Sequence, residues 1–202
     1  MQNERFAAAL EIVLAFEGGY VHDPRDPGGE TYRGVSRRYH PGWPGWAVID
    51  AYKEDSRFPG IIDADAKLPQ FIQDFYRREF WDRVRGDRLP GDVALLVFDT
   101  AVNMGVGPAV KMLQKALNNL LPEPVLAVDG IPGPATLAAV ASLGKDAGAG
   151  LCPEYLALRE ERYRRLAAAR PSLQKFLKGW LRRLDRLQNG LRPAPGHEKM
   201  AG

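Results

Sequence analysis

The sequence predicts a mainly α-helical protein with one small β element. In most segments, apolar residues recur every three or four positions, which is the pattern of amphipathic helices. The exception is residues 18–36, where two Asp-Pro pairs and two Gly-Gly pairs predict turns and a short β-hairpin. A chain of 202 residues can bury one sizeable core, with room for a small satellite lobe.

The first helix is expected over residues 4–16. Phe6, Leu10, Val13 and Leu14 fall on one stripe of it, and glycines at 18 and 19 end it. Further helices are expected near 47–55, over 67–82, after Pro90, from Gly107 to about Leu120, from Pro134 to Leu143, and over 153–169 and 172–190. The KDAGAG stretch at 145–150 is interpreted as a linker-like break, and the tail from 193 to 202 as flexible.

Composition narrows the class of protein. Apolar residues make up 45% and charged residues 26%, as in ordinary globular proteins. No apolar run reaches the roughly 18–20 residues of a membrane span. The first sixteen residues interrupt their apolar positions with charges, unlike a signal peptide. We therefore expect synthesis in the cytoplasm without a signal peptide, and release by a holin or a secretion system.

Two reactive residue types give no sign of a metal, cofactor or thiol site. Cys152 is the single cysteine, so an internal disulfide is excluded, and no histidine lies close to it in sequence. The three histidines show no metal-ligand spacing. We expect no metal and no cofactor.

Positive charge is concentrated near the C-terminus. Residues 153–192 hold eleven Lys or Arg and four Asp or Glu, whereas the first 152 residues carry a net negative charge. This pattern suits contact with an anionic envelope polymer or lipid surface, and it equally suits a solvated helix face. The stretch has no nucleic-acid recognition motif and its basic residues alternate with acidic ones, so no specific nucleic-acid partner is expected.

The segment from Phe16 to Val35, FEGGYVHDPRDPGGETYRGV, carries the clearest chemistry. It places Glu17 at a helix exit, facing a glycine-rich loop with a second carboxylate, Asp26. Glycosidic-bond cleavage needs such a pair, one group to protonate the leaving oxygen and one to stabilise positive charge or orient water. The alternative is a turn-rich hairpin that happens to follow a glutamate, because Gly, Pro and Asp dominate tight turns.

The same cluster resembles a known family. Glu17-Gly-Gly-Tyr20, Asp26-Pro-Gly-Gly29, Thr31 and Gly34 are similar to the bacterial and phage lysozymes of glycoside hydrolase family 108. The resemblance continues through YRREFWDRV at 76–84, FDTAVNMG at 98–105, and LQKAL with DGIPGPAT at 113–136, which is like the peptidoglycan-binding region that accompanies this family. It covers residues 6 to about 187.

The resemblance implies a lysozyme-like fold and an N-acetylmuramidase, of the phage endolysin type, that cleaves the β-1,4 bond between N-acetylmuramic acid and N-acetylglucosamine. The family's catalytic glutamate corresponds to Glu17. Asp26 and Thr31 look like the other members of a Glu-Asp-Thr triad, although their spacing differs by one residue. Asp23 is the alternative second carboxylate. Glu17 shielded by neighbouring aromatic rings would stay protonated near neutrality and serve as the general acid.

Four residues are candidates for sugar contacts, because they lie in the family-like segments: Tyr20, Tyr32, Trp81 and Asn103. Trp81 has an alternative place in the core, since it continues an apolar helical stripe. The expected organisation is a catalytic region at 1–107 and a compact helical region at 108–192 that includes the peptidoglycan-binding segment. That segment also fits a plain helix-turn-helix core.

Two other functions remain open at this point. A lytic transglycosylase also uses one glutamate, but it forms an anhydro product and does not need Asp26. A non-catalytic wall-binding or secretion-accessory protein would bind peptidoglycan without cleaving it. In each case the expected partner is the glycan strand of peptidoglycan, and the protein is expected to be a monomer.

Overall fold

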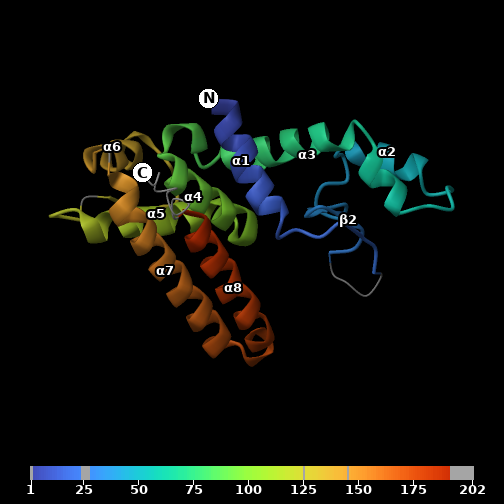
Figure 1. Cartoon of the computed structure of the whole chain (residues 1–202). Helices are drawn as coiled ribbons and strands as arrows, with labels where there is room; N and C mark the ends of the chain where they lie inside the picture. Colours follow the sequence, from blue (N-terminus) through green and yellow to red (C-terminus); the bar gives the residue numbers. More distant parts are fainter. Residues whose placement is uncertain (1, 24–27, 125, 145, 192–202) are drawn as a thin grey trace, which may run out of the picture. The chain divides into compact units, whose positions relative to one another are not determined.

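The computed structural model describes residues 2–23, 28–124, 126–144 and 146–191, and it confirms a mainly helical protein with a small antiparallel sheet (Figure 1). Packing divides the chain into two compact units, Met1–Asp87 (unit 1) and Arg88–Gly202 (unit 2). Asp26 and the tail at 193–202 lie outside the described residues. Among the helices that are described, none combines the length and apolar character needed to cross a membrane.

Unit 1 is built around two helices that pack together, α1 (Gln2–Leu14) near the N-terminus and α3 (Leu68–Tyr76) further along the chain. Phe6, Leu10 and Val13 of the first helix are buried, as their spacing predicts. Their core continues into Trp81, whose ring centroid lies 5.4 Å from that of Phe6. The elements are α1 (Gln2–Leu14), β1 (Tyr20–Val21), β2 (Thr31–Tyr32), β3 (Val35–Ser36), α2 (Gly45–Ala51), a 3-10 turn (Gly60–Ala64), α3 (Leu68–Tyr76), a π-helical turn (Arg77–Trp81) and a 3-10 turn (Gly86–Arg88) that crosses into unit 2.

The β element is a three-stranded antiparallel sheet in the order β1-β2-β3, one strand more than the predicted hairpin. Tyr32 pairs with Val35, so only Arg33 and Gly34 connect β2 to β3. Both have positive φ, 44° and 80°. Two-residue hairpin loops of type I′ need positive φ at both central positions, and glycine adopts it without strain. The sequence therefore places Gly34 where the tightest turn of unit 1 requires it.

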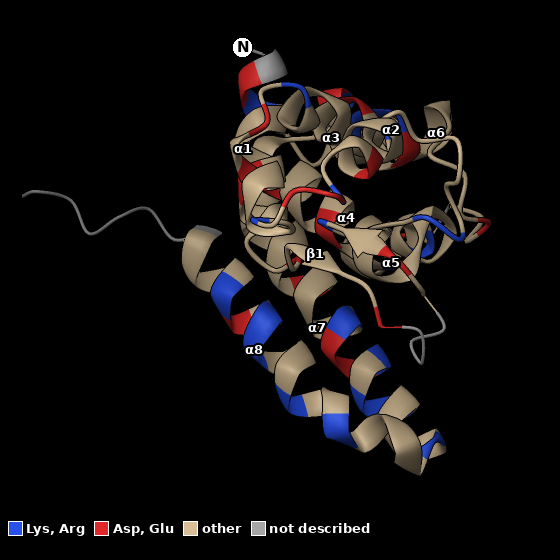
Figure 2. Cartoon of the chain, turned by 90° about the vertical axis from the view of Figure 1, so that its right-hand side faces the viewer, with Lys and Arg blue, Asp and Glu red and all other residues tan. Residues whose placement is uncertain are grey.

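Unit 2 is a set of packed helices in which α7 and α8 run side by side (Figures 1 and 2). Its elements are α4 (Gly91–Met104), α5 (Val106–Leu120), α6 (Pro134–Ser142), α7 (Ala147–Ala169), a 3-10 turn (Pro171–Leu173) and α8 (Gln174–Leu191). The family-like Asp129-Gly130 turn between α5 and α6 is held by buried Gln114, whose side-chain amide donates to Asp129 and whose carbonyl accepts from the Gly130 amide.

Charged side chains form the centre of unit 2. Asp99 of α4 is fully buried and accepts hydrogen bonds from Arg159 of α7 at 2.6 Å and from Arg183 of α8 at 2.7 Å. Arg159 also donates to the hydroxyl of Tyr163. Two of the basic residues that give the C-terminal segment its charge excess thus share one countercharge inside the unit.

One feature of unit 2 differs from expectation. The predicted break at 145–150 is wrong from residue 147 onward, because α7 begins at Ala147 and continues through Pro153. Ala147 is 3% exposed and Leu151 is fully buried, so tertiary packing outweighs the poor helix propensity of glycine and proline there. In addition, α4 packs with α5 and α7, and the two compact units separate between residues 87 and 88. The expected division into a catalytic and a C-terminal region at 107 and 108 stays a prediction.

Candidate active site

Glu17 stands just beyond the end of α1, in unit 1. Tightened turns continue the helix, because the Phe16 amide donates to the Val13 carbonyl at 3.0 Å and the Glu17 amide to the Leu14 carbonyl at 3.1 Å. Gly18 and Gly19 follow at once and lead into β1. The side chain of Glu17 is half-buried. A rigid backbone therefore presents a carboxyl group that solvent reaches only in part.

The carboxyl group of Glu17 lies against the tight turn between β2 and β3. A Cβ atom placed on Gly34 would be 3.1 Å from Oε2 of Glu17, and it would collide with the hydroxyl of Tyr76. That hydroxyl donates to the Arg33 carbonyl at 2.8 Å, while the Arg33 amide donates to the Gly19 carbonyl at 3.2 Å. The turn is thus tied both to α3 and to the segment that carries Glu17. Only glycine fits at position 34, for its backbone conformation and for its lack of a side chain.

The other predicted catalytic residues are placed in part. Thr31 lies in the central strand β2, where its hydroxyl donates to the Gly29 carbonyl at 3.2 Å. Asp26 falls outside the described residues, whereas Asp23, the alternative carboxylate, is half-buried in the loop after β1. The joint geometry of Glu17, Asp26 and Thr31 therefore stays a prediction.

Glu30, just before β2, organises a cluster of charges that the sequence interpretation did not single out. Its carboxylate accepts from the Tyr20 hydroxyl at 2.8 Å and from Arg37 at 2.9 Å, and it pairs with Lys53 at 2.9 Å. Burial alone would raise the pKa of Glu30, but the hydrogen bonds from these three partners outweigh it and lower that pKa. Burial and the bond to Glu30 raise the pKa of Tyr20 to about 12. Tyr20 thus holds the sheet in place with its hydroxyl.

A depression of about 540 Å³ adjoins the same turn. Tyr32 and Arg33 line one side of it, and Arg33 forms an ion pair with Asp63 at 3.5 Å. The other walls come from α1, from the residue after it and from α3: Ala7, Leu10, Glu11, Leu14, Ala15, Pro69, Ile72 and Gln73. Its volume is within the range of small-molecule sites, roughly 300–1,000 Å³.

Two of the aromatic candidates, Trp81 and Tyr32, are buried. Trp81 is 1% exposed, its indole N–H donates to Asp87 at 2.9 Å, and Gly86 packs directly beneath its ring. It offers no ring face to a sugar, so the expectation of a glycan contact is corrected to a core role. Tyr32 lines the depression, but it is only 2% exposed and stacks on Trp43 with ring centroids 6.3 Å apart. Stacking on a sugar needs a free ring face, which neither residue presents.

Asn103 belongs to unit 2, at the end of α4. It is exposed, and its side-chain oxygen accepts from the Tyr163 hydroxyl at 2.7 Å. Tyr163 is in turn held by Arg159 and so by Asp99. The orientation of Asn103 is therefore set by the buried charge network of unit 2.

Two residues are understood only from the structure: Tyr76, which the sequence pattern does not place at the site, and Cys152, whose reactivity depends on its burial. Tyr76 lies in the helix predicted over 67–82, and only the fold reveals that its hydroxyl secures the turn beside Glu17. Cys152 is buried, and burial raises the pKa of its thiol to about 12, which keeps it an inert thiol.

Comparison with known proteins matches the chain to two family models and to a solved structure. Residues 10–105 match the model of the family described as Glycosyl hydrolase 108, and residues 108–185 match the model described as Predicted Peptidoglycan domain. The structure of SagA from Brucella abortus superposes with a TM-score of 0.60 at 31% sequence identity, over 93% of this chain and 94% of that one. No curated protein matches the chain.

The family matches meet between residues 105 and 108, so the catalytic-family segment includes α4, which packs in unit 2. Glu17, the Gly34 turn and Tyr76 all fall within that segment. Both matched segments and the similarity to SagA across nearly the whole chain lead to one assignment: this protein belongs to the glycosyl hydrolase 108 family and is a glycoside hydrolase that acts on peptidoglycan.

Proposed function

We propose that the protein is an N-acetylmuramidase, which hydrolyses the β-1,4 bond between N-acetylmuramic acid and N-acetylglucosamine with Glu17 as the general acid. The observation that carries the proposal is the half-buried carboxyl group of Glu17 held against the Gly34 turn at the end of a rigid helix. A general acid has to be fixed in place and partly shielded from water in order to deliver its proton to the glycosidic oxygen.

The remaining catalytic roles belong to the same proposal. Asp26, or Asp23 in its place, stabilises the positive charge that develops on the sugar ring or orients the attacking water. Thr31 holds that water through its hydroxyl. These roles correspond to the pair of carboxyl groups that glycoside hydrolases use, one as the acid and one to stabilise charge or activate water.

The test is mass spectrometry of purified peptidoglycan digested by the wild type and by Glu17→Gln. Glutamine keeps the size of the side chain but cannot donate a proton as an acid. We expect reducing N-acetylmuramic acid ends from the wild type, and a loss of about 10²–10⁴-fold in the variant. Circular dichroism of the variant should match the wild type, which separates lost chemistry from lost folding.

Other products would replace the proposal. Anhydro-muramic ends would assign a lytic transglycosylase, and full activity of Asp26→Ala with those ends would strengthen that assignment. Binding to sacculi without any soluble product would favour a wall-binding or secretion-accessory role. Substantial hydrolysis by Glu17→Gln would remove Glu17 from the acid's role.

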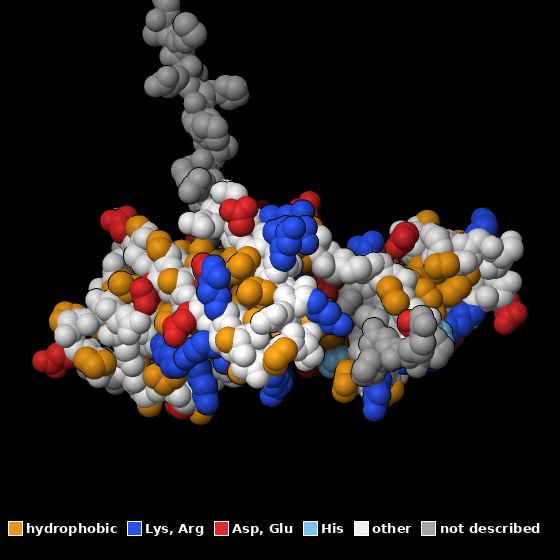
Figure 3. Space-filling model, turned by 90° about the horizontal axis from the view of Figure 1, so that it is seen from below, with side chains coloured by type: hydrophobic (Ala, Val, Ile, Leu, Met, Phe, Trp, Pro, Cys, Tyr) orange, Lys and Arg blue, Asp and Glu red, His pale blue; other side chains and the backbone are white. Residues whose placement is uncertain are grey.

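The proposal also includes the route by which the enzyme reaches the cell wall. The enzyme is made in the cytoplasm as a monomer and reaches the wall through a holin or a secretion system, as an endolysin or an equivalent lytic enzyme does. Basic residues along α7 and α8 (Figure 2) support a contact with the anionic envelope. In the view of Figure 3, Lys and Arg side chains form several separate groups among hydrophobic ones, so such a contact is diffuse and sensitive to salt.

A further inference from the structure

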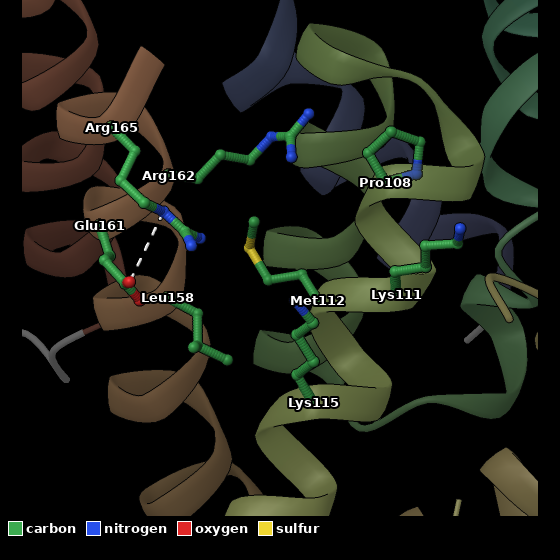
Figure 4. Close-up of a pocket in the computed structure, with 8 residues that line it drawn as sticks. All are labelled: Pro108, Lys111, Met112, Lys115, Leu158, Glu161, Arg162 and Arg165. Carbon is green, nitrogen blue, oxygen red and sulfur yellow. Dashed lines mark ion pairs between the residues drawn. The ribbon is translucent and has the colours of Figure 1, made fainter. Parts of the chain in front are cut away.

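A basic groove between α5 and α7 is the feature of unit 2 that the catalytic proposal does not use. Its volume is about 500 Å³ (Figure 4). One face of each helix lines it, at positions i, i+3, i+4 and i+7 on both. Those residues are Pro108, Lys111, Met112 and Lys115 on α5, and Leu158, Glu161, Arg162 and Arg165 on α7.

The groove combines an apolar floor with an excess of positive charge. Met112 is 6% exposed and Leu158 is half-buried, so apolar groups form part of the lining. Four cations line the groove against one carboxylate, Glu161, which lies 3.5 Å from Arg165. In the part of the chain that the structure describes, Lys111, Lys115 and Arg162 belong to no ion pair.

Arg162 gives the clearest sign that the groove is built for a ligand. Its side chain extends from α7 toward α5 (Figure 4). Its Nε atom is buried and has no hydrogen-bond acceptor among the described residues, and it is the only such side-chain atom found there. A buried donor without an acceptor costs about 1–3 kcal/mol, so groups of this kind are rare unless a ligand or water completes them. A carboxylate at the guanidinium group would supply the missing acceptors.

We propose that this groove binds the stem peptide of peptidoglycan, with the peptide's carboxylates on Arg162 and Lys115 and its aliphatic atoms on Met112 and Leu158. The proposal rests on peptidoglycan being the substrate, and it assigns to unit 2 the recognition of the peptide while Glu17 acts on the glycan. The groove is large enough for a ligand of that size, because pockets of roughly 300–1,000 Å³ hold small molecules.

The lining favours a peptide over a phosphate-bearing polymer. A uniform polyanion would be repelled by the exposed carboxylate of Glu161, and it would find no use for the apolar floor. A stem peptide carries amide and amino groups that can donate to Glu161, in addition to carboxylates for the cations. The mixture of charges in the groove matches a ligand that is itself mixed.

The experiment measures binding in the full-length chain with Glu17→Gln as background, so that no glycan is cut. The probe is a synthetic stem tripeptide of L-alanine, γ-linked D-glutamate and meso-diaminopimelate, titrated by calorimetry at low salt. Its fully amidated form, inorganic phosphate and glycan stripped of peptides are titrated in parallel. Adding Arg162→Gln or Lys115→Gln should weaken tripeptide binding about tenfold or more, because each removes a charge-assisted hydrogen bond.

Arg164→Gln is the matched control. Arg164 lies on α7 beside Arg162, but it is outside the groove and pairs with Glu160 at 2.6 Å. It removes the same charge from the same helix, so its effect on binding should stay below about twofold if contact rather than overall charge decides. Lys115 is exposed, so its variant tests the groove without disturbing the core.

Three results would overturn the inference: equal binding of the amidated peptide, a stronger effect of phosphate or stripped glycan than of the tripeptide, or equal losses in Arg164→Gln and the groove variants. A failure of the muramidase proposal is distinguishable, because it would appear as absent reducing ends in the wild-type digest while the peptide titration is unaffected.

Discussion

The two units use pairs of arginine and carboxylate in different ways. In unit 1, Arg37 and Lys53 of the Glu30 cluster are each 34% exposed, and Asp50, their other partner, is 40% exposed. In unit 2, Asp99 and Arg159 are both fully buried. Charges at a surface can be lost at little cost, whereas a buried charge that loses its partner strongly destabilises the fold. The comparison predicts that the loss of a charged partner destabilises unit 2 more than unit 1.

Asp99→Asn is the strongest test of this difference between the two units. The change leaves the guanidinium of Arg159 buried without a countercharge, and Arg183 loses its bidentate partner. We expect a loss of about 3–5 kcal/mol in the free energy of unfolding, measured by denaturant titration.

Glu160→Gln is the corresponding control in the same unit. Glu160 pairs with Arg164 one helical turn away, and both side chains are about half exposed. Its removal should cost about 0.5 kcal/mol or less. Equal losses in the two variants would mean that the Asp99 network contributes no more than a surface pair, and the contrast between the units would fail.

Many features of the fold and of the candidate site can be predicted from the sequence. The features that cannot be predicted depend on contacts between residues that are distant in the sequence. The buried stripe of α1 and the glycines that place Glu17 at its end are local patterns, so spacing alone locates them. The hydrogen bond from Tyr76 to Arg33 joins residues 43 positions apart, and no local pattern encodes it. The start of α7 was missed for the same reason, because the burial of Leu151 overrides the local signal of glycines and Pro153.

The turn beside Glu17 gives the next largest effect. Gly34→Ala adds a side chain at φ +80° and forces Tyr76 or Glu17 to move. We expect a loss of about 2–3 kcal/mol in stability, because backbone strain and a steric clash are combined. We also expect hydrolysis to fall by about 10²-fold, since small displacements of a catalytic group cost that much. Muropeptide release and thermal unfolding are the measurements.

Gly144→Ala is the control that distinguishes backbone strain from displacement of the catalytic side chain. Gly144 also has positive φ, +74°, but a Cβ atom there would meet nothing within 4 Å. Its substitution should cost about 1–2 kcal/mol through strain alone and leave hydrolysis unchanged. If Gly34→Ala retained full activity at equal loss of stability, the Gly34 turn would have no part in positioning Glu17.

Among the residues around the site, the smallest effect on stability is expected at Glu30, where its dependence on pH gives a further test. The pKa of Glu30 lies below its ordinary value of 4.5, so its ion pairs stabilise the folded state above about pH 4.5 and lose that effect as the pH falls further. Glu30→Gln should therefore cost about 1 kcal/mol at neutral pH, where Arg37 and Lys53 are partly solvated. It should cost progressively less toward pH 3, and thermal unfolding across this range would reveal the convergence. The loss of stability is expected because the Glu30 carboxylate accepts from Tyr20 and Arg37 and pairs with Lys53. If the cost of Glu30→Gln did not shrink in acid, Glu30 would stabilise the fold through its packing and not through its charge.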